Sequence, residues 1–340
     1  HLTGAQPGEV VAMNSLTINL HLMLASFYRP SGRRTKILIE AGAFPSDRHA
    51  AVSQIEWHGL DPSAELIELA PRPDSDLIEE RALEALLAER GEEIAVVLWP
   101  GVQYLTGQAF DLGVIAAAAR RAGCVIGFDL AHAIGNLPLA LHDVGADFAV
   151  WCSYKYLNAG PGAIGGCFVH ARHCGAASPP RLAGWWGHDP STRFEMGPYF
   201  WAAQGADGWQ VSNPPILSSA PLVASLEMFK SAGIGRLREK SIALTDFLGR
   251  LLEPLPLTLV TPRDPAARGC QLSIRIGARA GGGAMPNRGH RIFNSLKDHG
   301  VVCDWREPDI IRVAPAPLYT RFEDVFRFAG RLAHALKTVP

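Results

Sequence analysis

Hydrophobic positions in the first half of the chain follow two alternating patterns. Leu16, Leu20 and Leu24 recur at the spacing of one helix face, directly after the polar Ser15, and this pattern predicts a helix with a polar cap. Continuous apolar runs, typical of strands buried on both faces, follow it. Strands are predicted at 37–40, 94–99, 124–129, 147–151 and 166–170, with helices at 80–90 and 110–122. This alternation predicts an α/β fold with a mainly parallel sheet.

The pattern changes in the second half of the chain. Residues 178–215 are rich in Gly, Pro and Trp and show little periodicity, and a segment of this length is typical of a functional or interface loop. Helices are predicted at 218–232, 235–252, 289–299 and 322–336, and strands near 257–261, 271–276 and 310–314. We therefore expect a large domain over residues 1–253, a smaller α+β domain over residues 254–340, and a flexible loop around Gly281–Gly283.

Composition excludes several classes of protein. With 340 residues, 48% of them hydrophobic, the chain is too long for a minimal binding module and too apolar for global disorder. Its 32 Lys and Arg against 33 Asp and Glu give a formal charge of −1, so no bulk field attracts nucleic acid or an anionic membrane. The apolar runs fall short of the ~18 residues that a membrane helix needs. Six cysteines without a CxxC pair predict a reducing, cytoplasmic setting.

One segment carries most of the candidate chemistry. Asp129 and His132 lie at the end of a predicted strand, and Lys155 lies in a loop shaped by Gly160 and Gly162 after another strand. Pyridoxal phosphate requires such a pair, because a lysine amine forms its Schiff base and a carboxylate keeps its ring nitrogen protonated. A surface lysine and a helix-capping aspartate would give the same spacing. Spacing alone leaves both interpretations open.

Nine ordered sequence blocks, from about Pro7 to the last helix, separate these interpretations. They are SLTINLHLML at 15–24, FPSD at 44–47, GVQYLTGQ at 101–108, FDLAHAIGN at 128–136, WCSYKYLNAGPG at 151–162, GWWGH at 184–188, STRFEM at 191–196, SNPPIL at 212–217 and IRVAPAPLY at 311–319. In these blocks the chain resembles the kynureninase family, which has the fold type I of pyridoxal 5'-phosphate enzymes. The resemblance implies a large domain with a mainly parallel sheet and a smaller C-terminal α+β domain.

The resemblance also implies an activity and a set of site residues. The activity is hydrolysis of L-kynurenine or 3-hydroxy-L-kynurenine to anthranilate or 3-hydroxyanthranilate and L-alanine, a step of tryptophan catabolism and NAD biosynthesis. The residues implied at the cofactor are Leu16, Thr17, Phe44, Pro45, Ser46, Asp47, Asp129, His132, Tyr154, Lys155, Trp185 and Asn213. By the same resemblance, Arg312 receives the substrate α-carboxylate and Asn213 lies near the substrate ring, where it suggests tolerance of a ring hydroxyl.

Individual roles follow from the same resemblance. Lys155 would bond to the cofactor and move the substrate α-proton, and Tyr154 would donate to the phosphate and relay a proton. Asp129 would pair with the ring nitrogen, with His132 close by. The ring of Phe44 would stack on the cofactor, with Asp47 near its polar edge. Leu16 and Thr17 would bind the phosphate at a helix start, where unpaired N–H groups favour an anion.

Three of these residues also have a purely structural interpretation. Phe44 alone would be an ordinary core aromatic, Trp185 a packing residue, and Arg312 a surface arginine on a strand. The cluster of His170, His173 and Cys174 lacks a complete tetrahedral ligand set, so we expect a surface cluster and no metal.

Two other functions stay open, and a dimer is expected. A class V aminotransferase or a cysteine desulfurase would generally carry His or Gln immediately before the lysine, where this chain has Tyr154. An inactive, truncated chain is also possible, since the family carries a segment ahead of the block at Pro7 that lines the substrate pocket. The resemblance further implies a homodimer, with the loop around Trp185 and residues 199–213 reaching the partner's cofactor.

Overall fold

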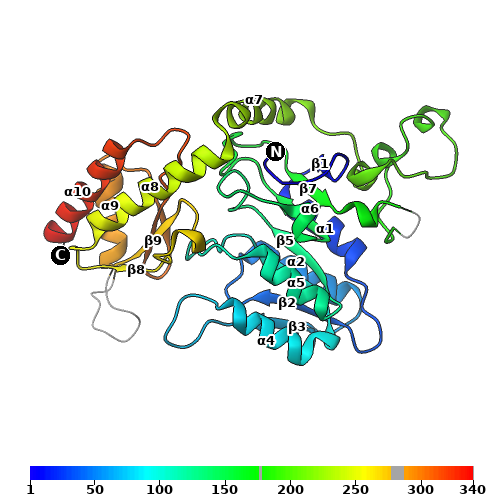
Figure 1. Ribbon diagram of the computed structural model, residues 1–340, viewed down its shortest axis with the longest axis horizontal. Coiled ribbons are helices and arrows are strands. Elements are labelled where there is room, and N and C mark those ends of the chain that lie inside the picture. Colours follow the sequence, from blue (N-terminus) through cyan, green and yellow to red (C-terminus); the bar gives the residue numbers. More distant parts are fainter. Residues whose placement is uncertain (176–177, 277–286, 340) are drawn as a thin grey trace. The chain divides into compact units, whose positions relative to one another are not determined.

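The computed structural model describes residues 1–175, 178–276 and 287–339. The chain forms two compact units. The first unit comprises His1–Gly101 and Phe110–Ser231, and the second comprises Val102–Ala109 and Ala232–Pro340 (Figure 1). The loop around Gly281–Gly283, expected to be flexible, lies outside the described residues. Among the helices of the described ranges, none has the length and apolarity needed to cross a membrane.

A seven-stranded sheet forms the centre of the first unit. In spatial order it contains β1 (Val10–Ala12), β7 (Gly166–Val169), β6 (Phe148–Trp151), β5 (Val125–Asp129), β4 (Ile94–Pro100), β2 (Lys36–Glu40) and β3 (Leu66–Leu69). The strands from β6 to β3 are parallel, which confirms the predicted mainly parallel sheet. β7 runs antiparallel to β6, because the residues between them form no crossover helix, and a parallel return requires one.

Helices surround this sheet. They are α1 (Leu16–Phe27), α2 (Pro45–Trp57), α3 (Pro62–Glu65), α4 (Glu80–Arg90), α5 (Leu112–Arg121), α6 (Leu141–Val144) and α7 (Ile216–Ala232). The apolar periodicity correctly predicted α1, α4, α5 and α7. It missed α2, whose buried face consists mostly of Ala50, Ala51 and Ile55 beside polar side chains, so the hydrophobic signal is weak. Pro45 at the first helical position marks its start.

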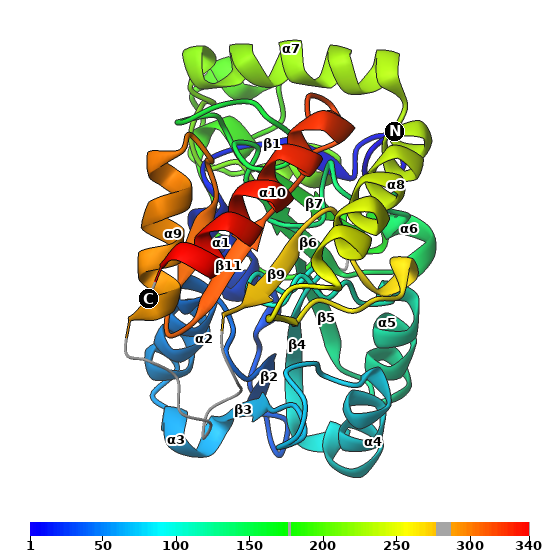
Figure 2. The same ribbon diagram turned by 90° about the vertical axis from the view of Figure 1, so that its left-hand side faces the viewer.

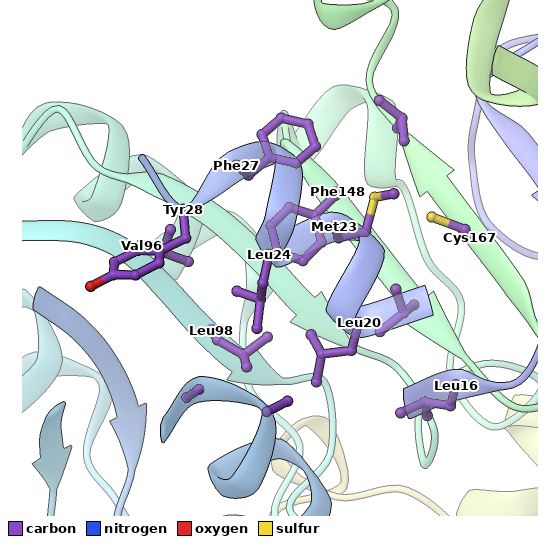
Figure 3. Close-up of a cluster of buried hydrophobic side chains, with 14 of the residues drawn as sticks. Leu16, Leu20, Met23, Leu24, Phe27, Tyr28, Val96, Leu98, Phe148 and Cys167 are labelled. Atoms are coloured by element: carbon purple, nitrogen blue, oxygen red, sulfur yellow. The ribbon is translucent and has the colours of Figure 1, made fainter. Parts of the chain in front are cut away.

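Packing of α1 on the sheet forms the main core of the first unit. Leu20 and Leu24 of α1 are fully buried, and Figure 3 shows them among Val96 and Leu98 of β4 and Phe148 of β6. Each buried leucine of this kind contributes about 1.5–3 kcal/mol relative to an exposed one. This packing fixes the first turn of α1 relative to the sheet.

The second unit is a four-stranded antiparallel sheet with helices on it. The strands are, in spatial order, β10 (Asp304–Arg306), β11 (Ile310–Val313), β9 (Leu272–Arg275) and β8 (Thr258–Leu259). The helices α8 (Ile234–Leu252), α9 (Arg288–Asp298) and α10 (Phe322–Thr338) pack beside it (Figure 2). Of these strands, β10 was not predicted, since it is only three residues long and a turn follows it directly.

The two units divide the chain differently from the boundary expected between residues 253 and 254. α8 belongs to the second unit because Leu244, Leu248 and Leu252 are buried in the same core as β9 and α10. The segment Val102–Ala109 also belongs to it, and Gln271 donates to its backbone at Tyr104 O, at 3.0 Å. Neither feature has a local sequence signal, because both depend on long-range packing.

Gly127 of β5 offers a test of this core. A Cβ added there would lie 2.0–2.6 Å from three ring carbons of Phe148, so we expect Gly127→Ala to lower the free energy of unfolding by about 1–3 kcal/mol through overpacking. Urea unfolding followed by circular dichroism measures the change. The control is Gly249→Ala in α8, where a Cβ meets open space and stability should stay equal or rise slightly. An unchanged midpoint for Gly127→Ala would contradict the packing.

Candidate active site

The carboxyl ends of the parallel strands carry acidic residues. β2 ends at Glu40 and β5 ends at Asp129, while Lys155 follows β6 in the loop before β7. Since parallel strands end at the same edge of a sheet, this edge gathers the polar side chains of the first unit.

Two aspartates form a buried pair at this edge. Asp129 is 8% exposed and accepts a hydrogen bond from Ala131 N at 2.7 Å. Asp47, in the first turn of α2, is buried and shares a hydrogen bond with Asp129. Burial, and then the charge of Asp129, raise the pKa of Asp47 well above its ordinary value. In the described part of the chain, Oδ1 of Asp47 is buried and has no hydrogen-bond partner. The pair therefore suits a further proton donor or cation.

Glu40 adds a third buried acid that the sequence analysis missed. It is 4% exposed, and burial followed by the charge of Asp129 raises its pKa to about 8. The only local signal was a charged residue ending an otherwise apolar strand. Lys155 acts in the opposite direction, since its charge lowers the pKa of Asp47. The edge therefore gathers more potential negative charge than this lysine balances.

The amine of Lys155 lies over an aromatic ring. Its Nζ is 5.5 Å from the centre of the Phe44 ring, within the range of a cation–π contact. Phe44 is the residue directly before α2 and is 37% exposed, so it is not the ordinary core aromatic of the alternative interpretation. A flat ligand at Lys155 would therefore meet the face of this ring.

Tyr154, beside the lysine, is suited to hold a proton. Its side chain is half exposed. Burial of the hydroxyl, and then its contact with Cys152, raise the pKa of Tyr154 to about 12. The phenol is therefore protonated at neutral pH and can donate, but it is a poor base.

Two helix starts meet at the predicted phosphate residues. Thr17 Oγ1 in the first turn of α1 is 2.7 Å from Ser46 Oγ in the first turn of α2. Neither helix has a side-chain cap from its N-cap residue, Ser15 or Phe44. The first N–H groups of a helix lack partners within the helix, and its dipole favours an anion there. Leu16, Thr17, Pro45 and Ser46 thus line two helix starts suited to a phosphate.

The remaining predicted residues of the first unit lie in different surroundings. His132 follows Asp129 by three residues, and its ring packs edge-on against Tyr156 at 5.6 Å. The indole of Trp185 donates to Arg193 O at 3.3 Å and packs against Trp186 within its own loop, and it is 47% exposed. Asn213 is exposed. The contacts found for Trp185 and Asn213 do not join them to Lys155.

Arg312 lies in the second unit, on β11. Its side chain is 12% exposed, which excludes the surface arginine of the alternative interpretation. The guanidinium donates to Asp304 Oδ2 at 2.6 Å through Nε, and to the backbone carbonyl of Tyr104. Arg312 is therefore a half-buried cation whose guanidinium is fixed by Asp304 and Tyr104 O.

One histidine of the expected surface cluster, His170, lies beside a buried acid. Ligand atoms of Glu9, His142 and His170 lie within 4.8 Å of one another. Glu9 is 1% exposed, and its Oε1 is 2.8 Å from both His142 Nδ1 and Ala171 N. These hydrogen bonds already use the carboxylate, and they join the segment before β1 to the end of β7. His170 therefore has Glu9 and His142 as neighbours, which the sequence analysis did not include in the cluster.

The edge of the first sheet fits pyridoxal 5'-phosphate. Asp47 and Asp129 suit a protonated ring nitrogen, Phe44 suits the flat ring, and the starts of α1 and α2 suit the phosphate. Lys155 carries the amine that a bond to the aldehyde carbon requires. The fit rests above all on the buried, unpartnered Oδ1 of Asp47.

The raised pKa of Glu40 predicts a pH dependence of stability in the cofactor-free protein. Between about pH 4.5, its ordinary value, and about pH 8, the unfolded chain loses the proton that the folded chain keeps. The unfolded state then binds fewer protons, so stability falls as the pH rises through this window. Glu40→Gln should make this fall less steep, and Asp47 accounts for part of what remains. Urea midpoints measured from pH 5 to pH 8 check it.

The control for Glu40→Gln is Glu56→Gln, on the exposed surface of α2. This variant should retain the steepness of the native protein. An equal pH dependence in all three proteins would show that Glu40 does not keep its proton in the folded state.

Two family models match this chain. Aminotransferase class-V matches residues 4–278, and the kynureninase C-terminal domain matches residues 237–332. Among solved structures, the complex between the cystine C-S lyase C-DES and its product cysteine persulfide has a TM-score of 0.80 at 20% identity, covering 98% of this chain and 83% of that chain. A cysteine desulfurase from Thermococcus onnurineus NA1 has a TM-score of 0.77 at 17% identity, covering 99% and 81%. These likenesses establish the fold.

Curated relatives are more similar in sequence. A kynureninase of Xanthomonas campestris pv. campestris (strain B100) is 60% identical over 327 residues, which are 95% of this chain and 76% of the relative. A kynureninase of Xanthomonas euvesicatoria pv. vesicatoria (strain 85-10) is 58% identical over 334 residues, covering 97% and 77%. With these relatives, the two family models and a site that fits the cofactor, the chain belongs to the kynureninase family of pyridoxal-phosphate enzymes.

Proposed function

We propose that this chain hydrolyses the Cβ–Cγ bond of L-kynurenine to give anthranilate and L-alanine. The observation that carries the proposal is the approach of Lys155 to Phe44, beside the buried pair of Asp47 and Asp129, in a chain of the kynureninase family. The balance is one water consumed for one carbon–carbon bond broken. The aromatic acid takes the hydroxyl, and alanine takes the proton at its β-carbon.

The first unit supplies the residues that would hold the cofactor. Asp129, supported by Asp47, would hold the proton on the ring nitrogen, and Phe44 would stack on the ring. Thr17 and Ser46 would donate to the phosphate. When bound, pyridoxal phosphate supplies the electron sink that stabilises a carbanion at the substrate α-carbon. His132, three residues after Asp129, would lie close by.

Two neighbouring residues would move protons. The amine of Lys155 takes the proton from the substrate α-carbon and returns it during turnover. Tyr154 keeps its proton at neutral pH, because its pKa is raised to about 12 by burial, so it acts as a donor to the phosphate or to the leaving carbon.

Substrate recognition involves groups outside this pair. Arg312 would bind the α-carboxylate through its planar fork. Asn213 would lie near the substrate ring, where its amide tolerates a 3-hydroxyl group, so 3-hydroxy-L-kynurenine is a substrate as well. Trp185 and Asn213 are both exposed, and the contacts found for them do not include Lys155. This supports the proposal that they contribute to the active site of a partner subunit.

Exposed apolar side chains of the first unit support a homodimer. α7 begins with Ile216 and Leu217, which are 80% and 89% exposed. Large exposed apolar side chains also cluster in the loop from 182 to 201 of the same unit: Leu182, Trp185, Phe194, Met196, Tyr199, Phe200 and Trp201. An apolar surface of this extent is typical of an interface, and a second copy of the chain is the partner that the family's symmetry supplies.

The cysteines argue against a desulfurase with the same fold. A desulfurase needs a reactive thiolate, which requires exposure and a lowered pKa. Burial raises the pKa of all six thiols: Cys124, Cys152, Cys167, Cys174, Cys270 and Cys303. All six are free, which supports a cytoplasmic location, where thiols stay reduced.

Activity provides the first test. The purified protein with pyridoxal phosphate should release fluorescent anthranilate from L-kynurenine and 3-hydroxyanthranilate from the hydroxylated substrate. Lys155→Ala should lower the rate by roughly 10²–10⁴-fold, since it removes the group that transfers the proton. Lys297→Ala, an exposed lysine of α9, is the control and should retain activity. Sulfide release from cysteine without anthranilate formation would instead favour the desulfurase.

Oligomeric state provides the second test. In light scattering after gel filtration, the native chain should have twice the mass of 36.6 kDa. Leu217→Glu should shift it to the monomer, because a buried carboxylate without a partner destabilises an apolar interface. Val302→Glu, at a fully exposed position of the second unit, should leave the dimer intact. A native monomer, or a dimer that survives Leu217→Glu, would contradict this interface.

A further inference from the structure

Arg312 is held by two neighbours that belong to the second unit. Asp304 of β10 lies directly opposite Arg312 across the β10–β11 pair, so the backbone places both side chains on the same face. Nε of Arg312 donates to Asp304 Oδ2 at 2.6 Å, Nη2 also contacts that oxygen, and Nη1 donates to Tyr104 O. The guanidinium plane is thus fixed from two sides.

These contacts show which edge of the Arg312 guanidinium is held within the protein. Asp304 holds the side edge, formed by Nε and Nη2, and Tyr104 O accepts from Nη1. A carboxylate can also bind end-on, across Nη1 and Nη2, and this is not the edge that Asp304 holds. Asp304 therefore orients the fork without taking the place of a substrate carboxylate.

Charge at this cluster stays positive. Asp304 also accepts from Nε of Arg306 at 2.9 Å, so one carboxylate faces two guanidinium groups. Both guanidinium carbons lie 5.9 Å from the centre of the Tyr104 ring. Asp304 is 45% exposed, whereas Arg312 is 12% exposed. A partly exposed ion pair contributes little to stability, so the consequence of this pair is orientation of the less exposed partner.

We propose that Asp304 is the positioning residue that holds Arg312 in the orientation needed to bind the substrate α-carboxylate. The inference rests on the proposed function, in which Arg312 receives that carboxylate. Removing the charge of Asp304 frees the guanidinium to rotate about its long side chain, and binding of the carboxylate must then order it again. The loss falls on substrate binding, because Asp304 touches neither the cofactor nor the bond that breaks.

The test compares Asp304→Asn with Asp309→Asn in the holoenzyme. Asp309 accepts from Arg275 Nε at 3.0 Å, so its variant removes an Arg–Asp pair of the same sheet without touching Arg312. For Asp304→Asn we expect KM for L-kynurenine to rise about tenfold, with kcat within about twofold of the native value. The dissociation constant of L-alanine, from an absorbance titration, should rise by a similar factor. Asp309→Asn should change neither, and Asp304→Glu should recover part of the loss.

A ligand without an α-carboxylate distinguishes a loss of Arg312 orientation from general disruption of the binding site. Kynuramine, which is kynurenine without its α-carboxylate, should inhibit the native enzyme and Asp304→Asn equally. A KM that stays unchanged or falls, or an equal loss of affinity for kynuramine, overturns the inference. If the native protein forms no anthranilate, the proposed function fails, while the L-alanine titration still decides the role of Asp304.

Discussion

Accumulated negative charge at one edge of the first sheet is the constraint on which the site depends. Glu40, Asp47 and Asp129 are all buried there, and buried like charges cannot all ionise without a compensating cation. Within the protein, Lys155 supplies part of that compensation. A protonated ring nitrogen held by the aspartate pair, as we propose, would supply more, so binding of the cofactor would relieve this repulsion. This explains why so much acid is tolerated at a strand end.

The rest of the first unit fixes the two helix starts that we propose for the phosphate. Packing of α1 against β4 and β6 fixes the first turn of α1, and the contact of Thr17 with Ser46 ties that turn to the start of α2. Asp47 lies one residue after Ser46 on the same helix. One short helix turn thus contributes to both the phosphate end and the nitrogen end, which makes the site rigid with few residues.

Parts of this arrangement could be predicted from the sequence, for identifiable reasons. α1 and α4 have strong apolar periodicity, and the sequence blocks indicated Lys155 and Asp129. α2 could not be predicted, because alanines on its buried face give a weak signal. Glu40 was missed because a charged residue at a strand end is usually a solvated one, whereas the fold buries Glu40 near Asp47 and Asp129. The boundary between the units depended on the packing of α8 on β9, which no local pattern encodes.

Similarity of fold does not decide the chemistry of this chain. A cysteine desulfurase and a cystine C-S lyase share the fold, with TM-scores of 0.77 and 0.80, so the fold serves more than one reaction. The differences lie in side chains: Tyr154 precedes the lysine, and the six thiols are held in their neutral form by burial. Thiols with raised pKa values are poor nucleophiles at neutral pH, while a protonated phenol stands beside the lysine. A donor at that position suits a carbanion leaving group, which must be protonated before the product departs.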